Sequence, residues 1–318
     1  MYGLKDLKKI IKIDYNSVEC PVLNCCEKVK RQRQSFKRET QYQCPIHKIY
    51  ISPSTFEYEK EEDNLLWTDS FDQKLYNEIK EVKRESRIAR DNSEDALTWN
   101  VFRFLDKQKL LPDFLSQISQ KNIKKAELIL WSYSSVEKSS WTLLDRARLE
   151  FGETIARGSE PDIIILTNKV LYFIEAKLTA KNETKPSNPK NKKKYETGGN
   201  RIFENIFKSD YNTISEKEKR YELMRFWLLG SWIAKQLELD FEFYSLVMQT
   251  SEPNIEKEFG KHIIEAKNRK FRRITWEQIY DYIKSKAGKN EKKIMIDYFK
   301  NKTIGYASNR KIIKAFKR

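Results

Sequence analysis

Two runs of apolar residues stand out in the middle of the chain. The first extends from Asp162 to Thr167 and the second from Val170 to Leu178, and in both the apolar side chains fall on both faces of an extended strand. Strands of this kind are typical of a sheet that is covered on both sides. Asn168 and Lys169 separate the runs, and Asn tolerates the left-handed backbone of a tight turn, so the pattern predicts a β-hairpin.

The rest of the chain from about residue 71 alternates between helical and strand patterns. Ser93 is the expected N-cap of one helix, with Glu94 and Asp95 in its first turn. Apolar and aromatic positions in the helix at 215–236 favour a core role over a base-stacking platform. Alternating strands and helices indicate an α/β sandwich. We expect strands at 126–133, 241–248 and 271–275, and helices at 71–90, 93–105, 141–151, 215–236, 253–268, 276–286 and 291–300.

The predicted hairpin brings two acids together. A turn centred between Asn168 and Lys169 places Asp162 directly opposite Glu175. Opposed side chains in a sheet have Cβ atoms about 4.5–5.5 Å apart, and like charges there are destabilising. Mg²⁺ prefers one or two carboxylates and retains several waters, so a bound cation would explain the pair. Lys177 follows Glu175 by two positions and therefore projects from the same face.

This arrangement of Pro161-Asp162 followed by Glu175-Ala176-Lys177 resembles the signature of the PD-(D/E)xK nucleases. That superfamily contains restriction enzymes, repair nucleases and CRISPR-associated nucleases. The strict resemblance extends from Glu160 to Lys177, and the order of strands and helices from about 90 to 285 fits more loosely. The resemblance implies a restriction-endonuclease-like αβ sandwich with a central mixed sheet, and an endonuclease that depends on Mg²⁺ or Mn²⁺.

The resemblance also implies roles for single residues. Asp162 and Glu175 would ligate the metal, helped by the backbone carbonyl of Ala176, and Lys177 would orient the attacking water and stabilise negative charge. Glu94 resembles a further acid that the family places on an earlier helix, although the helix dipole favours acids in any first turn. The weaker alternatives are Asp95, Glu153 and Glu160.

Lys177 is not expected to be the general base. A free lysine has a pKa of about 10.4. Two neighbouring carboxylates would raise the pKa of Lys177 further rather than lower it towards neutrality. The metal is the better candidate for acidifying water.

The charge balance favours a nucleic-acid partner. The chain carries 62 Lys and Arg against 46 Asp and Glu, a formal net charge of +16. Such an excess displaces the counterions condensed on phosphate backbones, although a generally Lys-rich proteome would explain it too. A long Lys-rich loop is expected at 179–200, and such loops are usually functional or disordered. We interpret it as a phosphate clamp or as a solvated lysine run, with Lys192, Lys193, Lys194 and Arg201 as the candidate contacts.

All four cysteines lie between Cys20 and Cys44. Such crowding in one segment of a cytoplasmic protein indicates a metal site rather than disulfides. We expect structural Zn²⁺ held by Cys20, Cys25, Cys44 and His47, with Cys26 as the substitute for Cys25. Buried free thiols and an iron–sulfur cluster are the alternatives. The intervening basic stretch is suited to backbone phosphates, with Lys30, Arg31, Arg33, Lys37 and Arg38 as candidate contacts.

Together these patterns predict a basic zinc module at 1–70 and a nuclease domain at 71–318. The expected substrate is double-stranded DNA, and the expected role is restriction or anti-phage defence, by analogy with the family. A repair or CRISPR-associated processing nuclease, or a non-catalytic nucleic-acid-binding protein on a nuclease-like scaffold, is the alternative. A homodimer or a defence-complex partner is also considered. No segment approaches the roughly 20 apolar residues of a membrane span, and the N-terminus lacks an apolar signal core, so we expect a cytoplasmic protein.

Overall fold

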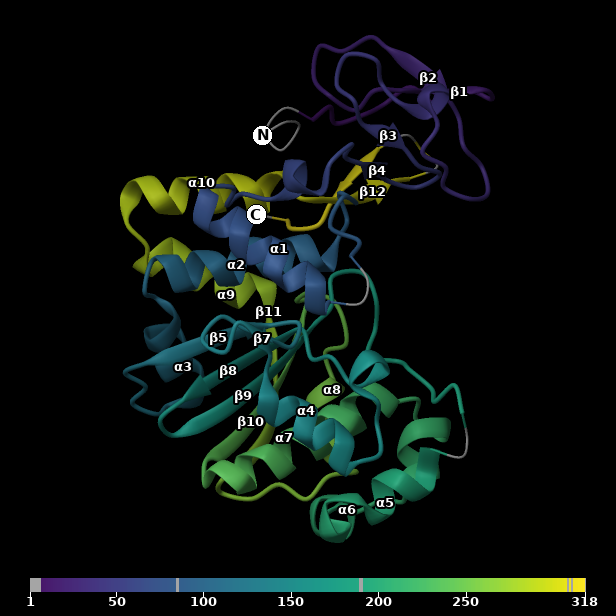
Figure 1. Ribbon diagram of the computed structural model, residues 1–318. Coiled ribbons are helices and arrows are strands. Elements are labelled where there is room, and N and C mark those ends of the chain that lie inside the picture. The colour runs from purple at the N-terminus through teal and green to yellow at the C-terminus, as the bar shows by residue number, and fades with distance from the viewer. Residues whose placement is uncertain (1–6, 84–85, 189–190, 308, 310, 318) are drawn as a thin grey trace. The chain divides into compact units, whose positions relative to one another are not determined.

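The computed structural model describes residues 7–83, 86–188, 191–307, 309 and 311–317 (Figure 1). The chain divides into two compact units. Unit 1 consists of Met1–Asp69, Ser86–Phe104 and Ile279–Arg318, and unit 2 consists of Ser70–Glu85 and Leu105–Gln278. Helices α2 (Glu94–Lys107) and α9 (Trp276–Lys286) each continue across a boundary between the units.

This division differs from the expected consecutive domains at 1–70 and 71–318. The boundary at Asp69 matches, but the last forty residues of the chain join the cysteine-bearing segment. The physical reason is the core of unit 1, because Tyr306 and Ile312 pack with Ile11, Val18 and Ile51 in one apolar cluster. The C-terminal segment therefore completes a core that the N-terminal residues begin.

Unit 2 is built on a mixed sheet of seven strands in the order β11-β10-β9-β8-β5-β6-β7. β9, β10 and β11 are parallel to one another, and all other neighbours in the sheet are antiparallel. This is an α/β unit with a central mixed sheet. The strands are β5 (Ala126–Leu130), β6 (Tyr133–Ser134), β7 (Ser139–Ser140), β8 (Ile163–Thr167), β9 (Val170–Ala176), β10 (Asp240–Val247) and β11 (Arg269–Thr275).

Both faces of this sheet are covered, as the apolar runs predict. Every residue of β9 is buried, because alternate side chains enter two different cores. Leu171 and Phe173 pack into a cluster with helices α4 and α7, which lie against one face in Figure 1. On the other face the hydroxyl of Tyr172 donates a hydrogen bond to Ser119 of α3. The helices are α1 (Ser70–Val82), α3 (Leu111–Ser119), α4 (Thr142–Glu150), α5 (Lys192–Arg201), α6 (Phe203–Ile206), α7 (Tyr221–Leu237) and α8 (Ile255–Gly260), with short turns η3 (Ile155–Arg157) and η5 (Thr213–Lys217).

Unit 1 contains three small antiparallel sheets around the cysteine cluster. Asp91 ties its segments together, because its carboxylate accepts hydrogen bonds from the hydroxyls of Tyr58 and Thr303. Ser93 caps α2 as predicted, and its hydroxyl accepts the N–H of Ala96 at 3.1 Å. The elements are β1 (Ser17–Glu19), β2 (Lys28–Lys30), β3 (Tyr50–Ile51), β4 (Phe56–Glu57), β12 (Thr303–Tyr306), β13 (Ile312–Lys314), η1 (Thr40–Tyr42), η2 (Glu61–Asn64) and α10 (Lys289–Asn301).

Three predicted element boundaries are wrong for local reasons. The helix expected from 215 begins at Tyr221, because Lys219 adopts a left-handed φ of 55° that interrupts it. The helix expected over 253–268 ends at Gly260, and Ile263 then pairs with Phe207 in an antiparallel bridge. The strand expected over 126–133 also stops at Leu130, where Trp131 and Ser132 take positive φ.

The loop expected over 179–200 is half helical, and residues 189–190 lie outside the described residues. Helix α5 covers Lys192–Arg201 because Tyr195 buries its ring against Tyr211 and Tyr221. Gly198, Gly199 and Asn200 depart from helical angles and kink its end. Among the helices in the described ranges, none has the length and apolarity to cross a bilayer.

Candidate active site and candidate metal centre

The hairpin of β8 and β9 has the predicted register. Ile163 pairs with Ile174 and Leu166 with Leu171, so Asp162, which directly precedes β8, lies opposite Glu175. One carboxylate oxygen of Asp162 accepts a hydrogen bond from the backbone N–H of Ala176 at 2.9 Å. The acid is therefore held at the strand end by the neighbouring backbone.

Lys177 projects beside Glu175 and contacts two acids. Its ammonium group donates to Oε1 of Glu175 and, at 3.2 Å, to Oε2 of Glu222. The backbone of Lys177 is also held in place, because the indole N–H of Trp276 donates to its carbonyl oxygen at 3.1 Å. The three predicted side chains therefore occupy one end of one sheet face.

Glu222 is the residue that the sequence analysis missed. It is the second residue of α7, and its backbone N–H donates to the hydroxyl of Thr184 at 2.8 Å. Its side chain is 29% exposed, so the cluster is open to solvent on this side. An acid in the first turn of a long apolar helix was the available signal, but such acids are common in any helix.

Three carboxylates lie near the ammonium group of Lys177. Glu175 and Glu222 contact it, and the charge of Asp162 also acts on it. Burial and the charge of Asp162 raise the pKa of Glu175 well above its ordinary value. Burial alone would lower the pKa of Lys177, but the charges of Glu175 and Glu222 raise it well above its ordinary value. Lys177 therefore stays protonated at neutral pH, as expected.

One carboxylate oxygen of the cluster can still accept a hydrogen bond or bind a cation. Oε2 of Glu175 is buried and has no hydrogen-bond partner among the described residues. A buried carboxylate oxygen without a partner is costly. The site thus combines neighbouring carboxylates with an unsatisfied carboxylate oxygen, and both features suit a small cation that binds oxygen.

A buried network supports the segment before Asp162. Glu153 pairs with Arg225 of α7 at 3.1 Å and accepts hydrogen bonds from the hydroxyls of Ser159 and Tyr195, each at 2.8 Å. Burial would raise the pKa of Glu153, but the charge of Arg225 and hydrogen bonds from Arg225, the backbone N–H of Ser159 and the hydroxyl of Tyr195 lower it. Arg148 also donates to the carbonyl of Ser159. The loop that leads into β8 is therefore clamped.

A second network holds the segment after Lys177. Ser245 of β10 is the strand neighbour of Glu175, and its hydroxyl accepts a hydrogen bond from the amide of Asn182 at 3.0 Å. Asn182 also donates to Glu252, which pairs with Arg220 at 3.1 Å. Arg220 in turn donates to the carbonyl of Asn182. These contacts fix both chain segments that flank the hairpin acids.

The other predicted acids do not join this cluster within unit 2. Glu153 forms an ion pair with Arg225, and Glu160 forms one with Lys83 at 3.7 Å. Glu94 is the first residue of α2 and, like Asp95, belongs to unit 1. Its role as a ligand therefore stays a prediction.

The predicted nucleic-acid contacts lie in two places, the cysteine-bearing segment of unit 1 and helix α5 of unit 2. In the cysteine-bearing segment, Lys30, Arg33, Lys37 and Arg38 are exposed, and Arg31 is half-buried. Arg33 lies 3.8 Å from the ring centre of the exposed Tyr15, and Arg38 donates to the carbonyl of Tyr58. In unit 2, Lys192, Lys193, Lys194 and Arg201 all lie on α5. Lys193 and Arg201 are exposed, whereas Lys194 lies half-buried over Tyr195.

The cysteine cluster gathers the four residues that the sequence predicts. Potential ligand atoms of Cys20, Cys25, Cys44 and His47 lie within 4.8 Å of one another. Cys25 and Cys44 Sγ are 3.9 Å apart, and Nδ1 of His47 is 3.5 Å from Cys20 Sγ. Tetrahedral zinc with bonds of about 2.3 Å to sulfur separates its ligands by about 3.5–3.8 Å. The cluster could therefore hold a metal ion such as zinc.

Local backbone geometry explains why Cys25 rather than Cys26 joins the cluster. Asn24 takes a left-handed φ of 63°, which turns Cys25 inward, and Cys26 is exposed. Lys48 takes a φ of 55° directly after His47, and its N–H donates to the carbonyl of Cys44 at 2.8 Å. Burial and the charge of Lys8 lower the pKa of His47, which keeps its ring neutral and able to ligate.

Comparison with known proteins adds no family to this geometry. No family model matches the chain, and no curated protein or solved structure matches it significantly.

Proposed function

We propose that this protein is a metal-dependent nuclease that hydrolyses phosphodiester bonds, with double-stranded DNA as the substrate. The observation that carries the proposal is the opposition of Asp162 and Glu175 across one hairpin, with Lys177 beside them. The net charge of +16 supports a polyanionic substrate. A role in restriction or anti-phage defence follows from the resemblance to PD-(D/E)xK enzymes alone.

The residues present fit a divalent cation such as Mg²⁺ or Mn²⁺. Asp162 and Glu175 would hold it, with the carbonyl of Ala176 as a further ligand. The unpartnered Oε2 of Glu175 supports this assignment, as does the proximity of the Asp162 and Glu222 carboxylates to Glu175. A divalent ion at this position supplies a Lewis acid that increases the acidity of water and offsets charge on a phosphate.

The side chains of this protein have separate tasks in that reaction. Lys177 remains protonated, so it orients water and stabilises the negative charge that develops on the phosphate. Glu222 also contacts the ammonium group of Lys177 and keeps it in place. Asp162 and Glu175 supply oxygen ligands from a rigid strand pair.

Plasmid cleavage tests this proposal. The protein is incubated with supercoiled plasmid and with matched DNA and RNA duplexes, with and without Mg²⁺ or Mn²⁺. We expect cation-dependent cleavage that falls about 100-fold or more in Asp162→Asn, Glu175→Gln and Lys177→Gln variants. The matched controls Glu204→Gln and Lys257→Gln change exposed residues of the same unit and should cleave normally.

Two outcomes would decide against a nuclease. One is binding of nucleic acid without cleavage under any of these conditions, which would favour a non-catalytic binding protein. The other is cleavage that the Asp162→Asn and Glu175→Gln variants retain in full, which would locate the activity elsewhere.

We further propose that the cysteine cluster holds structural Zn²⁺. Three thiolates and one neutral imidazole form the closed ligand set that zinc prefers. The site would pin the basic stretch from Lys30 to Arg38 as a phosphate-contacting surface. Substituting Arg33 and Lys37 by Gln should weaken DNA binding and reduce its salt dependence, as measured by fluorescence anisotropy.

A further inference from the structure

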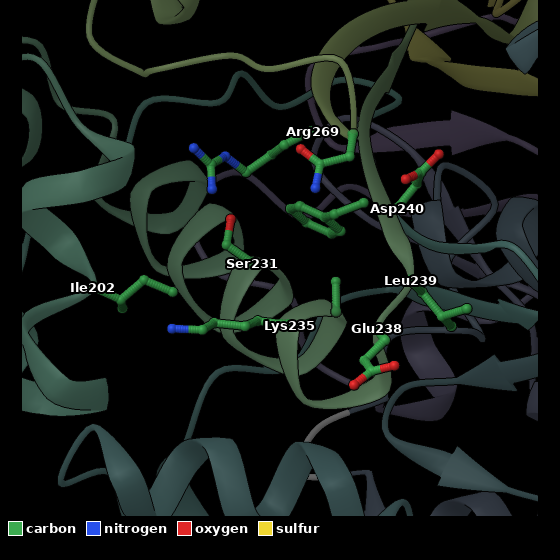
Figure 2. A pocket seen from close by; sticks show the side chains of 10 residues that line it. Ile202, Ser231, Lys235, Glu238, Leu239, Asp240 and Arg269 are labelled. Carbon is green, nitrogen blue, oxygen red and sulfur yellow. The ribbon is translucent and has the colours of Figure 1, made fainter.

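A pocket of about 370 Å³ opens in unit 2 where β10 and β11 begin (Figure 2). Its walls come from the C-terminal half of α7, the turn after it and the first residues of the two strands. β9 and β10 are parallel, and Glu175 lies five residues further along than the pocket edge at Asp240. The pocket is therefore roughly 16 Å along the sheet from the candidate active site. Its volume suits a small molecule.

Several polar groups in this pocket have unused hydrogen-bonding capacity. Ser231 is 4% exposed, and its hydroxyl has no partner among the described residues. Arg269 donates through Nε and Nη2 to the carbonyl of Ile264, at 3.2 and 3.0 Å, and through Nη2 to the carbonyl of Asn205 at 3.3 Å. No hydrogen bond of its Nη1 is found in the described ranges. By contrast, Arg220 and Arg225 of the same unit are paired with acids.

The charges are sorted across the pocket. Figure 2 shows the Ser231 hydroxyl between the side chains of Arg269 and Lys235, with Glu238 and Asp240 on the other side. Lys235 is exposed and forms no ion pair within the part of the chain described. Asp240 is already paired with Lys121 at 3.1 Å. The side chains of Arg269 and Lys235, which form no ion pair in the described structure, therefore lie on either side of the unpartnered Ser231 hydroxyl.

The remaining lining is apolar. Phe241 is buried at the base, and Leu239 lies beside it in the turn. A ligand that satisfies the whole pocket combines an oxyanion with an organic part. A tetrahedral phosphate offers several acceptor oxygens to a guanidinium, an ammonium and a hydroxyl that converge from different directions.

We propose that this pocket binds a phosphomonoester of about mononucleotide size. Arg269, Lys235 and Ser231 hold the phosphate, and the organic part packs on Phe241 and Leu239. The carboxylate of Glu238 accepts hydrogen bonds from hydroxyl or amino groups at the far end of the ligand. This inference does not depend on the proposed nuclease activity.

Isothermal titration of the full chain with 5′-AMP tests the inference, with adenosine and inorganic phosphate as parallel probes. The protein is freed of nucleic acid and kept in buffer without divalent cations or chelator. We expect saturable binding of AMP at one site, with adenosine and phosphate each at least about tenfold weaker because each lacks half of the contacts. Equal binding of adenosine, or no saturable binding of AMP, would overturn the inference.

Variants assign the site. Ser231→Ala should weaken AMP binding about tenfold, and Lys235→Gln about threefold. Neither side chain has a partner in the described structure, so neither change should disturb folding. Lys257→Gln removes an exposed lysine of α8 and should bind AMP like the unmodified protein. The inference fails if Ser231→Ala and Lys235→Gln both retain full affinity, or if Asp162→Asn alone abolishes binding.

Discussion

At the scale of single residues, the candidate active site places the buried carboxylate of Glu175 close to those of Asp162 and Glu222. Glu175 is 3% exposed, faces Asp162 and shares one ammonium group with Glu222. Burial and the facing carboxylate both disfavour its charged form. The sequence predicts the opposition of the two acids, but the degree of burial comes from the helices that cover the sheet.

The burial of Glu175 beside Asp162 predicts that the stability of the protein depends on pH. The folded-state pKa of Glu175 is raised above its unfolded value, so its favourable contribution is present at low pH and is lost as pH rises through the folded pKa. Without divalent cations, the melting temperature of the protein should therefore fall more steeply than that of Glu175→Gln as pH rises above the ordinary pKa of a glutamate.

Thermal melts across this range measure the difference between the two proteins. Glu204→Gln serves as the control, because Glu204 is exposed and should keep the steep profile. Parallel profiles for the unmodified protein and Glu175→Gln would contradict the raised pKa. Added Mg²⁺ should flatten the profiles of the unmodified protein and of Glu204→Gln, but not that of Glu175→Gln.

The buried pair of Glu153 and Arg225 predicts a loss of stability. In Arg225→Met the carboxylate of Glu153 stays buried without its cation, which should cost about 3 kcal/mol of unfolding free energy. Urea denaturation measures this cost. The exposed pair of Arg201 and Glu204 offers a matched control, and Arg201→Met should cost less than about 1 kcal/mol.

The pair of Glu153 and Arg225 also predicts how the stability of the protein changes at acidic pH. The pKa of Glu153 is lowered in the folded protein, so its stabilising effect is present above its unfolded pKa and is lost as pH falls through the folded value. The acid-induced loss of stability should be smaller in Arg225→Met. A cost in Arg225→Met no larger than that in Arg201→Met would show that the network does not clamp the loop before Asp162.

At the scale of elements, helix α7 organises unit 2. Its first turn carries Glu222, its second turn carries Arg225, and residues further along pack on the sheet at Trp227 and Gly230. The aromatic residues Tyr221, Phe226, Trp227 and Trp232 are buried, which confirms the predicted core role over base stacking. One helix thus links the sheet core to the candidate active site.

The close approach of α7 to β10 predicts the effect of a single methyl group. A Cβ at Gly230 would lie 2.1 Å from the ring of Phe241, which is itself buried. Although Ala favours helix, Gly230→Ala should therefore destabilise the protein by about 2 kcal/mol through overpacking. Chemical denaturation gives the value.

Gly260, the last residue of α8, is the natural comparison. A Cβ there meets nothing within 4 Å, so Gly260→Ala should be neutral or up to about 1 kcal/mol stabilising. If both substitutions were equally harmless, the close contact between α7 and β10 would not exist in solution.

At the scale of the whole molecule, the chain forms two units, and its C-terminal residues from Ile279 belong to the same unit as its N-terminal residues. The C-terminal Tyr306 completes the apolar cluster around Cys20 and Cys44, and its N–H donates to the carbonyl of Ser54 at 3.0 Å. Unit 1 has a small core of its own, and metals commonly stabilise such small modules.

Metal removal should therefore unfold unit 1 first. We expect one zinc per chain by native mass spectrometry, lost in Cys25→Ser and kept in Cys26→Ser, because only Cys25 lies in the cluster. Hydrogen exchange after chelation should show lost protection in β1–β4 and β12–β13 and retained protection in β8 and β9. Zinc loss in Cys26→Ser, a brown iron-containing protein, or first loss in β8 and β9 would contradict this assignment.

The amino-acid sequence by itself determined the local features: the hairpin and its register, the pairing of Asp162 with Glu175, the side of Lys177 and the four members of the cysteine cluster. Strand alternation, turn chemistry and ligand type act over short distances along the chain, so they can be read directly. Only the tertiary structure decided that Glu222 joins Lys177, that Arg225 neutralises Glu153 and that the C-terminal strands complete unit 1. Those contacts join residues 45 or more positions apart, and packing rather than any local preference brings them together.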